Sequence, residues 1–147
     1  MEYGIGKRID LDNILKLYRQ LNPDGDIFAH FQMEDANKVW DTIEKYNIKY
    51  FIAKNEGKII ASCYICIIPN LTYNGKSIGY LENVITDENY RRKGIGKRLM
   101  EMAIEYAKEE NCYKVVLQSG IKRAEAHKFY EKIGFNGETK KAYELRF

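Results

Sequence analysis

A basic turn containing two glycines lies between a strand pattern and a helix pattern, and it constrains the fold more than any other stretch. Residues 78–86 are rich in β-branched and aromatic residues, which is typical of a strand. From Leu99 onward apolar residues recur at helical spacing, and Asn111 is placed to end that helix. Between the two patterns lies the basic turn, residues 91–98. The sequence therefore predicts strand, turn and helix in that order.

The basic turn is suited to binding an anion. The first backbone N–H groups of a helix have no partner within the helix, and the helix dipole adds partial positive charge there. Gly94 and Gly96 have no Cβ that would keep a ligand away from the backbone. Five cations surround the same turn, namely Arg91, Arg92, Lys93, Lys97 and Arg98. These features predict a pyrophosphate cradle; the alternative is an ordinary solvated helix start.

Two common phosphate-binding motifs do not fit this turn. A P-loop requires Gly-Lys followed by Ser or Thr, whereas Gly96 and Lys97 are followed by Arg98, which has no hydroxyl for a magnesium ion. A dinucleotide fingerprint requires a third glycine where Leu99 stands and an acidic residue after the next strand. The sequence there is Gln118-Ser119. Both nucleotide-binding interpretations are therefore disfavoured.

The order Arg91-x-x-Gly94-x-Gly96 resembles the acetyl-CoA signature, Gln/Arg-x-x-Gly-x-Gly/Ala, of the GNAT superfamily of N-acyltransferases. Residues 82–90 resemble the strand and spacer that the family places before this signature, and residues 126–135 resemble its later helix at the expected separation. This resemblance implies a single N-acetyltransferase domain over residues 1–147. The implied fold is α/β, with a mixed, mostly antiparallel central sheet flanked by helices.

Length and composition agree with one globular domain. The chain has 147 residues, of which 45% are hydrophobic and two are prolines, so it can bury a core without disulfides or metal. A net charge of +3 is too small to indicate nucleic acid. Three cysteines cannot pair fully, and neither a signal segment nor an apolar run of roughly 20 residues is seen. We expect a reduced, cytoplasmic protein that does not contact a membrane.

Patterns outside the central stretch predict the remaining elements. Asp10 or Asp12 is placed to cap the first helix. The other expected elements are a first strand at 3–9, a helix at 35–46, a hairpin of strands 49–54 and 59–68, a strand at 114–118, a helix at 123–133 and a final strand at 140–147. The final strand would expose an edge and an apolar stripe, from which we predict a homodimer.

Cysteines and histidines give no metal site. Cys63 and Cys66 are three apart in a predicted strand and so point to opposite faces, which favours ordinary thiols over a metal or redox pair. His30 and His127 have no acidic or histidine partners at metal spacing. We expect structural or incidental roles for both histidines.

The resemblance also implies which residues bind acetyl-CoA. In the family, the backbone of the central strand holds the pantetheine arm and the basic turn holds the pyrophosphate. Many members have an asparagine where this chain has Arg123, and an arginine would meet a phosphate instead. The implied cofactor-binding residues are Val84, Ile85, Thr86, Arg91, Arg92, Lys93, Gly94, Ile95, Gly96, Lys97 and Arg123.

Two residues are candidates for the chemistry. The family tyrosine at the position of Tyr130 is thought to protonate the departing coenzyme A thiolate, whereas an aromatic residue on an amphipathic helix is by default part of the core. Glu82 is placed to accept a proton from an incoming ammonium, directly or through water. The ordinary alternative for Glu82 is a carboxylate that faces solvent.

The implied reaction is direct transfer of acetyl from acetyl-CoA to a primary amine of a small molecule, a peptide or a lysine side chain. In this family the N-terminal helices and their loop select the acceptor. Here that segment is residues 22–35, with the acidic and aromatic residues Asp24, Asp26, Phe28, Phe31, Glu34 and Asp35, and it favours a cationic amine. Residues 82–84 and 129–132 also resemble glucosamine-phosphate N-acetyltransferases, whose acceptor is anionic, and we rank that acceptor lower.

Two other classes of function stay open from the sequence. The basic turn is also compatible with binding nucleic acid phosphates while tyrosines stack on bases. Against this, the cations cluster at one turn and do not form a stripe. The third possibility is a sensor that binds acetyl-CoA without turnover.

Overall fold

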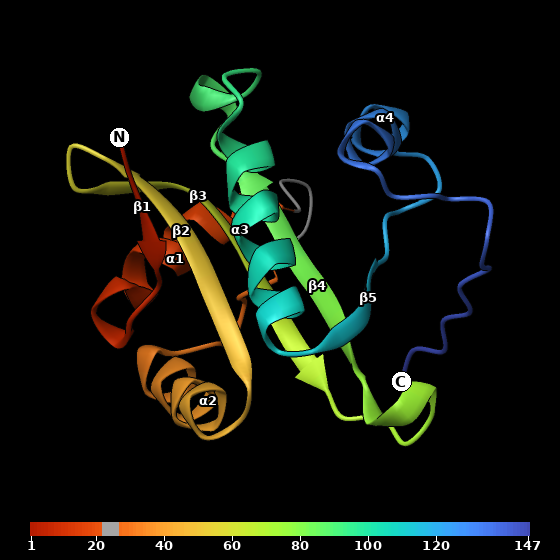
Figure 1. Cartoon of the computed structure of the whole chain (residues 1–147). Coiled ribbons are helices and arrows are strands. Elements are labelled where there is room, and N and C mark those ends of the chain that lie inside the picture. The colour runs from red at the N-terminus through yellow and green to blue at the C-terminus, as the bar shows by residue number, and fades with distance from the viewer. Residues whose placement is uncertain (22–26) are drawn as a thin grey trace. The chain divides into compact units, whose positions relative to one another are not determined.

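The computed structural model describes residues 1–21 and 27–147 (Figure 1). The described chain forms two compact units, Met1–Val116 and Leu117–Phe147. The helices and strands are β1 (Glu2–Ile5), α1 (Leu11–Tyr18), α2 (Met33–Lys45), β2 (Ile48–Asn55), β3 (Lys58–Ile68), β4 (Ser77–Thr86), α3 (Ile95–Glu109), β5 (Cys112–Leu117) and α4 (Ala124–Ile133). Single 3-10 turns lie at Arg8–Asp10, Tyr73–Gly75 and Glu88–Tyr90.

A five-stranded sheet in the order β1-β2-β3-β4-β5 organises the first unit. The first four strands pair antiparallel with their neighbours in sequence. Between β4 and β5 the chain passes through α3, which is the type of connection that parallel strands need. The prediction of a mixed, mostly antiparallel sheet flanked by helices is therefore confirmed, as is the β2–β3 hairpin.

Helices cover both faces of this sheet. On one face, apolar side chains of α1 and α2 pack against β2, β3 and β4, with Ile14, Trp40, Ile52, Ile59 and Ile85 among the buried members. On the other face α3 crosses the strands, as Figure 1 shows, and buries Leu99, Met100, Ala103 and Ala107. Successive residues of a strand point to opposite faces, so neighbouring positions serve the two cores in turn.

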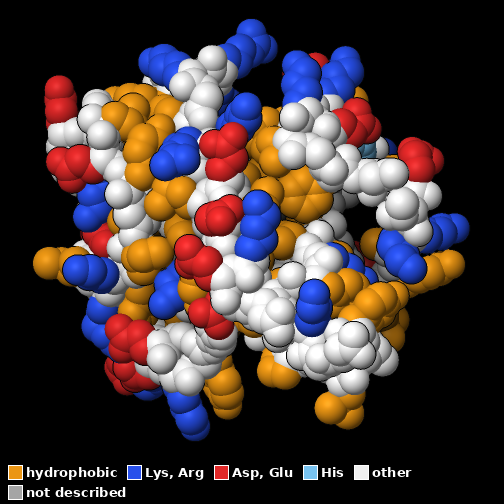
Figure 2. Space-filling model, in the orientation of Figure 1, with side chains coloured by type: hydrophobic (Ala, Val, Ile, Leu, Met, Phe, Trp, Pro, Cys, Tyr) orange, Lys and Arg blue, Asp and Glu red, His pale blue; other side chains and the backbone are white. Residues whose placement is uncertain are grey.

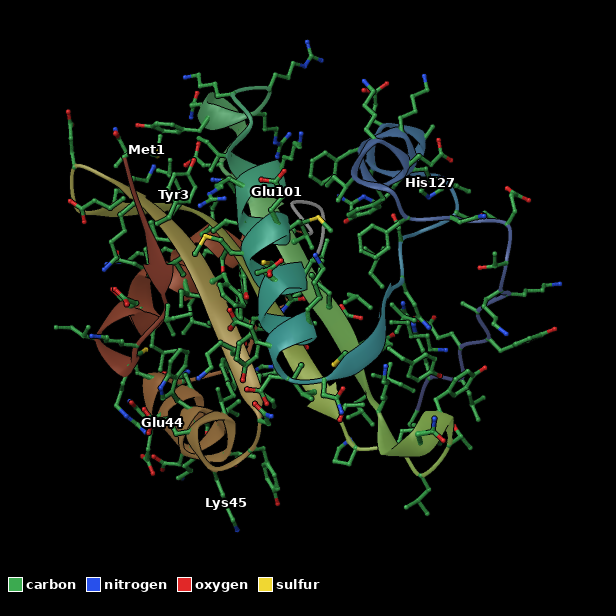
Figure 3. All side chains as sticks on the ribbon, in the orientation of Figure 1. Met1, Tyr3, Glu44, Lys45, Glu101 and His127 are labelled. Carbon is green, nitrogen blue, oxygen red and sulfur yellow. The ribbon has the colours of Figure 1, made fainter. Side chains whose placement is uncertain are left out.

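Gly79 lets α3 approach β4 closely. A Cβ at this position would lie 2.9 Å from Cδ1 of Ile65 and 3.3 Å from Cβ of Ala107. The outward side of α3 is polar, because Lys97 and Lys108 lie 3.7 and 3.1 Å from Glu101 and Glu105. Figure 2 shows acidic side chains gathered over this helix, and Glu101 is labelled on it in Figure 3. This alternation of buried and polar sides is the one that the sequence predicts.

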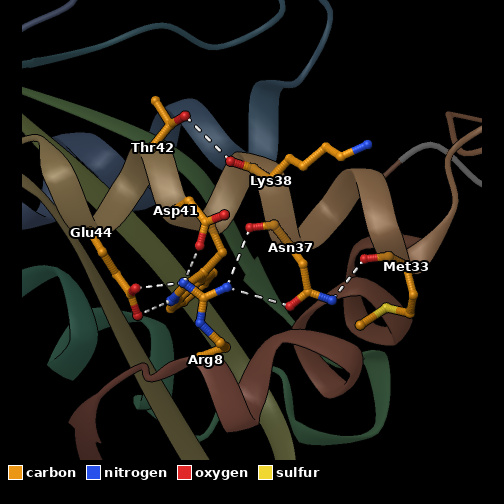
Figure 4. Close-up of polar contacts among 8 residues, drawn as sticks. Arg8, Met33, Asn37, Lys38, Asp41, Thr42 and Glu44 are labelled. Carbon is orange, nitrogen blue, oxygen red and sulfur yellow. Dashed lines mark hydrogen bonds and ion pairs between the residues drawn. The ribbon is translucent and has the colours of Figure 1, made fainter.

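Arg8 ties the turn after β1 to α2 (Figure 4). Its Nη2 lies 2.7 Å from Oδ1 of Asp41 and 2.5 Å from Oε2 of Glu44. Hydrogen bonding to Glu44 raises the pKa of Arg8, and Oε1 of Glu44 also accepts a 2.8 Å hydrogen bond from Nε1 of Trp40. The guanidinium of Arg8 is therefore linked, through Glu44, to the buried indole of Trp40 on α2.

Next to this ion-pair network lies a hollow of about 520 Å³. It is lined by Ile5, Gly6, Lys7, Arg8, Ile9, Trp40, Ile43, Glu44, Tyr46, Asn47, Ile48, Lys49 and Tyr50. None of these lining residues is a site residue predicted from the sequence.

The prediction of a final strand at residues 140–147 is wrong. That segment forms no strand, and its apolar residues Tyr143, Leu145 and Phe147 are more than 80% exposed. A segment of alternating apolar and polar residues forms a strand only where a partner strand supplies hydrogen bonds and a packing surface. The alternating pattern by itself does not supply that partner strand. The first strand is also shorter than expected, since it ends at Ile5 and gives way to a 3-10 turn. The segment 22–26 of the predicted acceptor loop lies outside the described residues.

The cysteines lie as their spacing predicts. Cys63 is buried and Cys66 half-buried, and both are free thiols. Burial raises the pKa of Cys63 to about 12, so its thiolate is strongly disfavoured. Among residues 1–21 and 27–147, no group of three or more His, Cys, Asp or Glu side chains is placed to hold a metal ion. Within the same ranges no helix is both long and apolar enough to cross a bilayer.

Candidate active site

The start of α3 is built as an anion site. Gly94 is the N-cap of α3 and has φ 76°, a left-handed conformation that favours glycine. The first helical hydrogen bond that involves this cap runs from the N–H of Arg98 to the carbonyl oxygen of Gly94, at 3.0 Å. The N–H groups of residues 95–97 precede that bond and point out of the helix end. A Cβ on Gly94 would meet no atom within 4 Å, so the space over this backbone is open.

Two of the cations hold the turn in shape. Nε of Arg91 donates a 3.1 Å hydrogen bond to the carbonyl oxygen of Thr86, the last residue of β4. Nζ of Lys93 donates to the carbonyl oxygen of Asn89, also at 3.1 Å, and lies 4.9 Å from the ring centroid of Tyr90. These contacts join the end of the strand to the beginning of the helix.

The other cations stay available to a ligand. Lys97 and Arg98 contact Glu101 at only 3.7 and 4.0 Å, and all three side chains are exposed, so these ion pairs are weak. Arg92 has a left-handed backbone with φ 61°. The predicted cradle thus combines an open helix end with exposed positive charge. An anion is favoured there by both the dipole and the side chains.

Asp87 anchors the spacer between β4 and the cradle, and sequence reasoning missed it. Its side chain is buried; Oδ1 accepts a 3.0 Å hydrogen bond from the N–H of Asn89, and Oδ2 lies 2.9 Å from Nζ of Lys58. Burial by itself would raise the pKa of Asp87, but the Lys58 ammonium and the Asn89 donors outweigh it and lower the pKa. The Asp-x-Asn spacing, typical of an Asx turn, was the available signal.

We expect Asp87→Asn to lower the free energy of unfolding by about 1–2 kcal/mol near neutral pH, because it removes a buried charge-assisted hydrogen bond. The folded pKa of Asp87 is below the ordinary 3.8, so its contribution is present above that pH and is lost as the pH falls through the lowered value. Urea unfolding of both proteins from about pH 7 down to pH 3 checks this. Asp12→Asn is the control, because Asp12 is exposed and pairs with Lys16 at the surface. A difference that did not shrink at low pH would contradict the role of the carboxylate.

Glu82 lies on β4 directly opposite Tyr64 of β3. It is half-buried and therefore differs from the fully solvent-facing carboxylate of the ordinary alternative. The next residue, Asn83, has φ 49°, and the register of β3 and β4 shifts between Ser62 and Tyr64. A bulge of this kind re-aims the neighbouring side chains. An asparagine inside a strand pattern was the signal for it.

The strand residues after the bulge reach the cradle. Ile85 is buried in the core, while Val84 and Thr86 are half-buried. Ile85 pairs with Ser62 and Thr86 pairs with Ala61. In an antiparallel pair, the N–H and C=O groups of every second residue point toward the partner strand. The backbone groups of the intervening residues of β4 therefore point away from β3 and toward β5. The first unit therefore brings together Glu82, this backbone and the basic turn.

Tyr130 and Arg123 belong to the second unit. Tyr130 is half-buried on α4, with ring centroids 5.4 Å from Phe129 and 6.3 Å from Phe135. Arg123 is the exposed N-cap residue of α4. Nε2 of His127 donates a 2.9 Å hydrogen bond to the carbonyl oxygen of Gly120, a structural contact of the kind expected for this histidine.

In this mixed sheet, β4 leads through the basic turn to the glycine-capped start of α3. This arrangement defines the class of acyltransferases that use a coenzyme A thioester. Residues 11–135 match the model of the Acetyltransferase (GNAT) family, and this chain belongs to that family. The family predicted from the sequence is thereby confirmed. Acetyltransferases of this family use acetyl-CoA, and the nucleic-acid alternative is not favoured.

Curated relatives agree on the class of reaction and differ in acceptor. A glucosamine 6-phosphate N-acetyltransferase of Trypanosoma brucei brucei is 38% identical over 87 residues, which cover 59% of this chain and 57% of the relative. N-alpha-acetyltransferase 30 of Xenopus laevis is 44% identical over 57 residues, 39% of this chain and 21% of the relative. The chain thus spans little more than half of the first relative's length.

A solved structure matches over the whole chain. The putative acetyltransferase from Agrobacterium tumefaciens str. C58 has a TM-score of 0.91 and 32% sequence identity, with 100% of both chains covered. The glucosamine-6-phosphate N-acetyltransferase of Arabidopsis thaliana has a TM-score of 0.79 at 23% identity, with 99% of both chains covered, and supports the fold alone.

Proposed function

We propose that this protein transfers the acetyl group of acetyl-CoA directly to a primary amine, as one N-acetyltransferase domain over residues 1–147. The observation that carries the proposal is the open, glycine-capped start of α3 with cations around it. The family match runs from residue 11 to 135 and so spans both compact units, which supports a single domain.

Most of the residues that we assign to acetyl-CoA lie in the first unit, and Arg123 lies in the second. The pyrophosphate is held by the N–H groups of residues 95–97 and by the basic turn, since an open space lies over Gly94. The backbone of residues 84–86 holds the pantetheine arm. Arg123 binds a further phosphate of the cofactor. The cofactor brings an activated thioester, and the protein supplies position and charge.

The chemistry requires three proton transfers. An ammonium does not attack a thioester, so the acceptor first loses a proton to Glu82 or to water. The neutral nitrogen then bonds to the acetyl carbon, the carbon–sulfur bond breaks, and the O–H of Tyr130 donates a proton to the sulfur. The nitrogen loses its second proton as the amide forms, and that proton restores the O–H of Tyr130. The products are an amide and free coenzyme A, with one proton released for each ammonium consumed. Backbone N–H groups near Ile85 and Thr86 stabilise the oxyanion.

Amine-dependent thiol release tests this proposal. We expect the protein and acetyl-CoA to release free thiol at least about tenfold faster when a suitable primary amine is added, because direct transfer needs both substrates. A colorimetric thiol assay over diamines, amino sugars, their phosphates and peptides measures it. Hydrolysis at the same rate without amine would contradict direct transfer. Acetyl-CoA binding without any thiol release would favour the sensor.

Compartment and assembly stay predictions. The prediction of a cytoplasmic location rests on the free thiols of Cys63, Cys66 and Cys112. The homodimer prediction rested on the final strand, which residues 140–147 do not form. The edge strand β1, with Tyr3 39% and Ile5 43% exposed, is the feature that now supports pairing of two copies.

A further inference from the structure

A row of aromatic residues leads across the α1 side of the sheet to Glu82. Tyr50, Tyr64 and Glu82 lie directly opposite one another on β2, β3 and β4. The rings of Tyr50 and Tyr64 stack with centroids 5.0 Å apart, and Trp40 of α2 lies 5.2 Å from Tyr50. Tyr50 therefore covers one side of the Tyr64 ring, and the other side faces the strand that carries Glu82.

Tyr80 flanks Glu82 from the other direction. It lies two residues earlier on β4 and so shares the same face of the sheet. Tyr64, Tyr80 and Glu82 are all half-buried, so a small molecule can reach them. Burial, followed by the charge of Glu82, raises the pKa of both tyrosines, and their hydroxyls stay protonated beside the carboxylate.

Buried polar groups lie next to this face. The hydroxyls of Tyr18 and Ser62 are buried, and Tyr18 lies within hydrogen-bonding reach of Ser62 and Asn83. Ser62 is next to the register shift opposite Asn83. Buried polar atoms are rarely left unpaired, because each such atom loses its hydration. These hydroxyls make the region next to the register shift polar.

The charge of this face is negative. On the strand positions that share it, β3 presents Ser62, Tyr64 and Cys66, and β4 presents Tyr80 and Glu82, so none of these is a cation. Two lysines of the neighbouring strands, Lys54 on β2 and Lys58 on β3, have acidic partners. Nζ of Lys54 lies 2.6 Å from Asp10, and Nζ of Lys58 lies 2.9 Å from Asp87. The named positions of β3 and β4 supply a carboxylate that can stabilise an ammonium, and they supply no cation to neutralise a phosphate.

We propose that Tyr64 and Tyr80 bind the acceptor ammonium against Glu82, and that the acceptor is therefore a cationic alkylamine without a phosphate group. This inference rests on the proposed acetyl transfer and adds the substrate class. The aromatic faces attract the cation and the carboxylate neutralises it before it loses its proton. The stack from Trp40 through Tyr50 holds Tyr64 in place, so its ring is ordered before the amine arrives.

Steady-state kinetics with 1,4-diaminobutane test the binding role. Tyr64→Leu and Tyr80→Leu are expected to raise the KM for the amine about tenfold, while the KM for acetyl-CoA and kcat stay within about threefold. Tyr113→Leu is the matched control, because Tyr113 is also a half-buried strand tyrosine stacked on another, Tyr73, with centroids 4.0 Å apart. An unchanged KM for the amine in both variants would overturn the proposal.

The acceptor class is tested with glucosamine and glucosamine 6-phosphate, which differ only in the phosphate. We expect kcat/KM for 1,4-diaminobutane to exceed that for glucosamine 6-phosphate at least tenfold. We also expect kcat/KM for glucosamine 6-phosphate to be no higher than that for glucosamine. A tenfold preference for the phosphorylated sugar would overturn the substrate class while leaving acetyl transfer intact.

Butyltrimethylammonium, which cannot be acetylated, separates binding from turnover. It is expected to compete with 1,4-diaminobutane and not with acetyl-CoA, and calorimetric titration of the Tyr64→Leu protein should show at least tenfold weaker binding. If butyltrimethylammonium binds in a way that depends on Tyr64 but no amine causes thiol release, only the proposed acetyl transfer is contradicted. The ammonium site then stands. Equal binding to the parent and to Tyr64→Leu would overturn the ammonium site.

Discussion

Gly94→Val is expected to abolish the rise in melting temperature that acetyl-CoA causes in the parent protein. The N–H groups at the start of α3 have open space over them at Gly94, and a branched side chain there would occupy the path of the phosphates. A phosphate that cannot approach this backbone neither accepts hydrogen bonds from the N–H groups nor interacts with the helix dipole. Thermal unfolding with and without saturating acetyl-CoA measures the effect.

The same substitution at Gly57 is the control. Gly57 has φ 77°, against 76° for Gly94, and a Cβ there also meets nothing within 4 Å. Both variants therefore carry a similar backbone strain, about 1–3 kcal/mol. Gly57→Val should unfold at a lower temperature and still be stabilised by acetyl-CoA. A folded Gly94→Val protein with parental affinity for acetyl-CoA would remove the cradle assignment.

Tyr130→Phe is expected to lower kcat about 100-fold or more, with acetyl-CoA binding close to that of the parent. The change keeps nearly all of the apolar area that contacts Phe129 and Phe135 and removes only the hydroxyl. A loss of this size is the usual scale of general acid catalysis. If the ring only packs, turnover should stay within about twofold. Single-turnover rates measure the chemical step apart from product release.

Tyr143→Phe is the matched control in the same unit. Tyr143 is 84% exposed in the segment that follows α4, so loss of its hydroxyl should leave kcat unchanged. The pH dependence adds a second measurement, because loss of a general acid removes the decline in rate that its deprotonation produces. Parental kcat for Tyr130→Phe would leave solvent as the source of the proton.

The predictable parts of this protein depend on local sequence. The basic turn, the glycine at a left-handed cap and the spacing of apolar residues after it are all contained in residues 78–111. A helix start and its open N–H groups follow from backbone geometry within a few residues. The family signature lies in the same stretch, and the family match confirms the identification made from it.

The missed site features depend on contacts between distant residues. Asp87 is held by Lys58, which lies 29 residues away, and the Asn83 bulge exists only as a shift in pairing with β3. Tyr50, Tyr64 and Glu82 become neighbours through the register of three strands. Each of these residues is unremarkable alone, because strand register is set by the whole sheet.

The sequence by itself determined the strand, basic turn and helix of residues 78–111, because these depend on interactions within one short segment, and the family signature lies in the same stretch. Only the tertiary structure decided that residues 140–147 form no strand and that Glu82 faces a row of tyrosines. A strand and a binding face both require partners supplied by other parts of the chain, and the free energy of those contacts is absent from any local pattern.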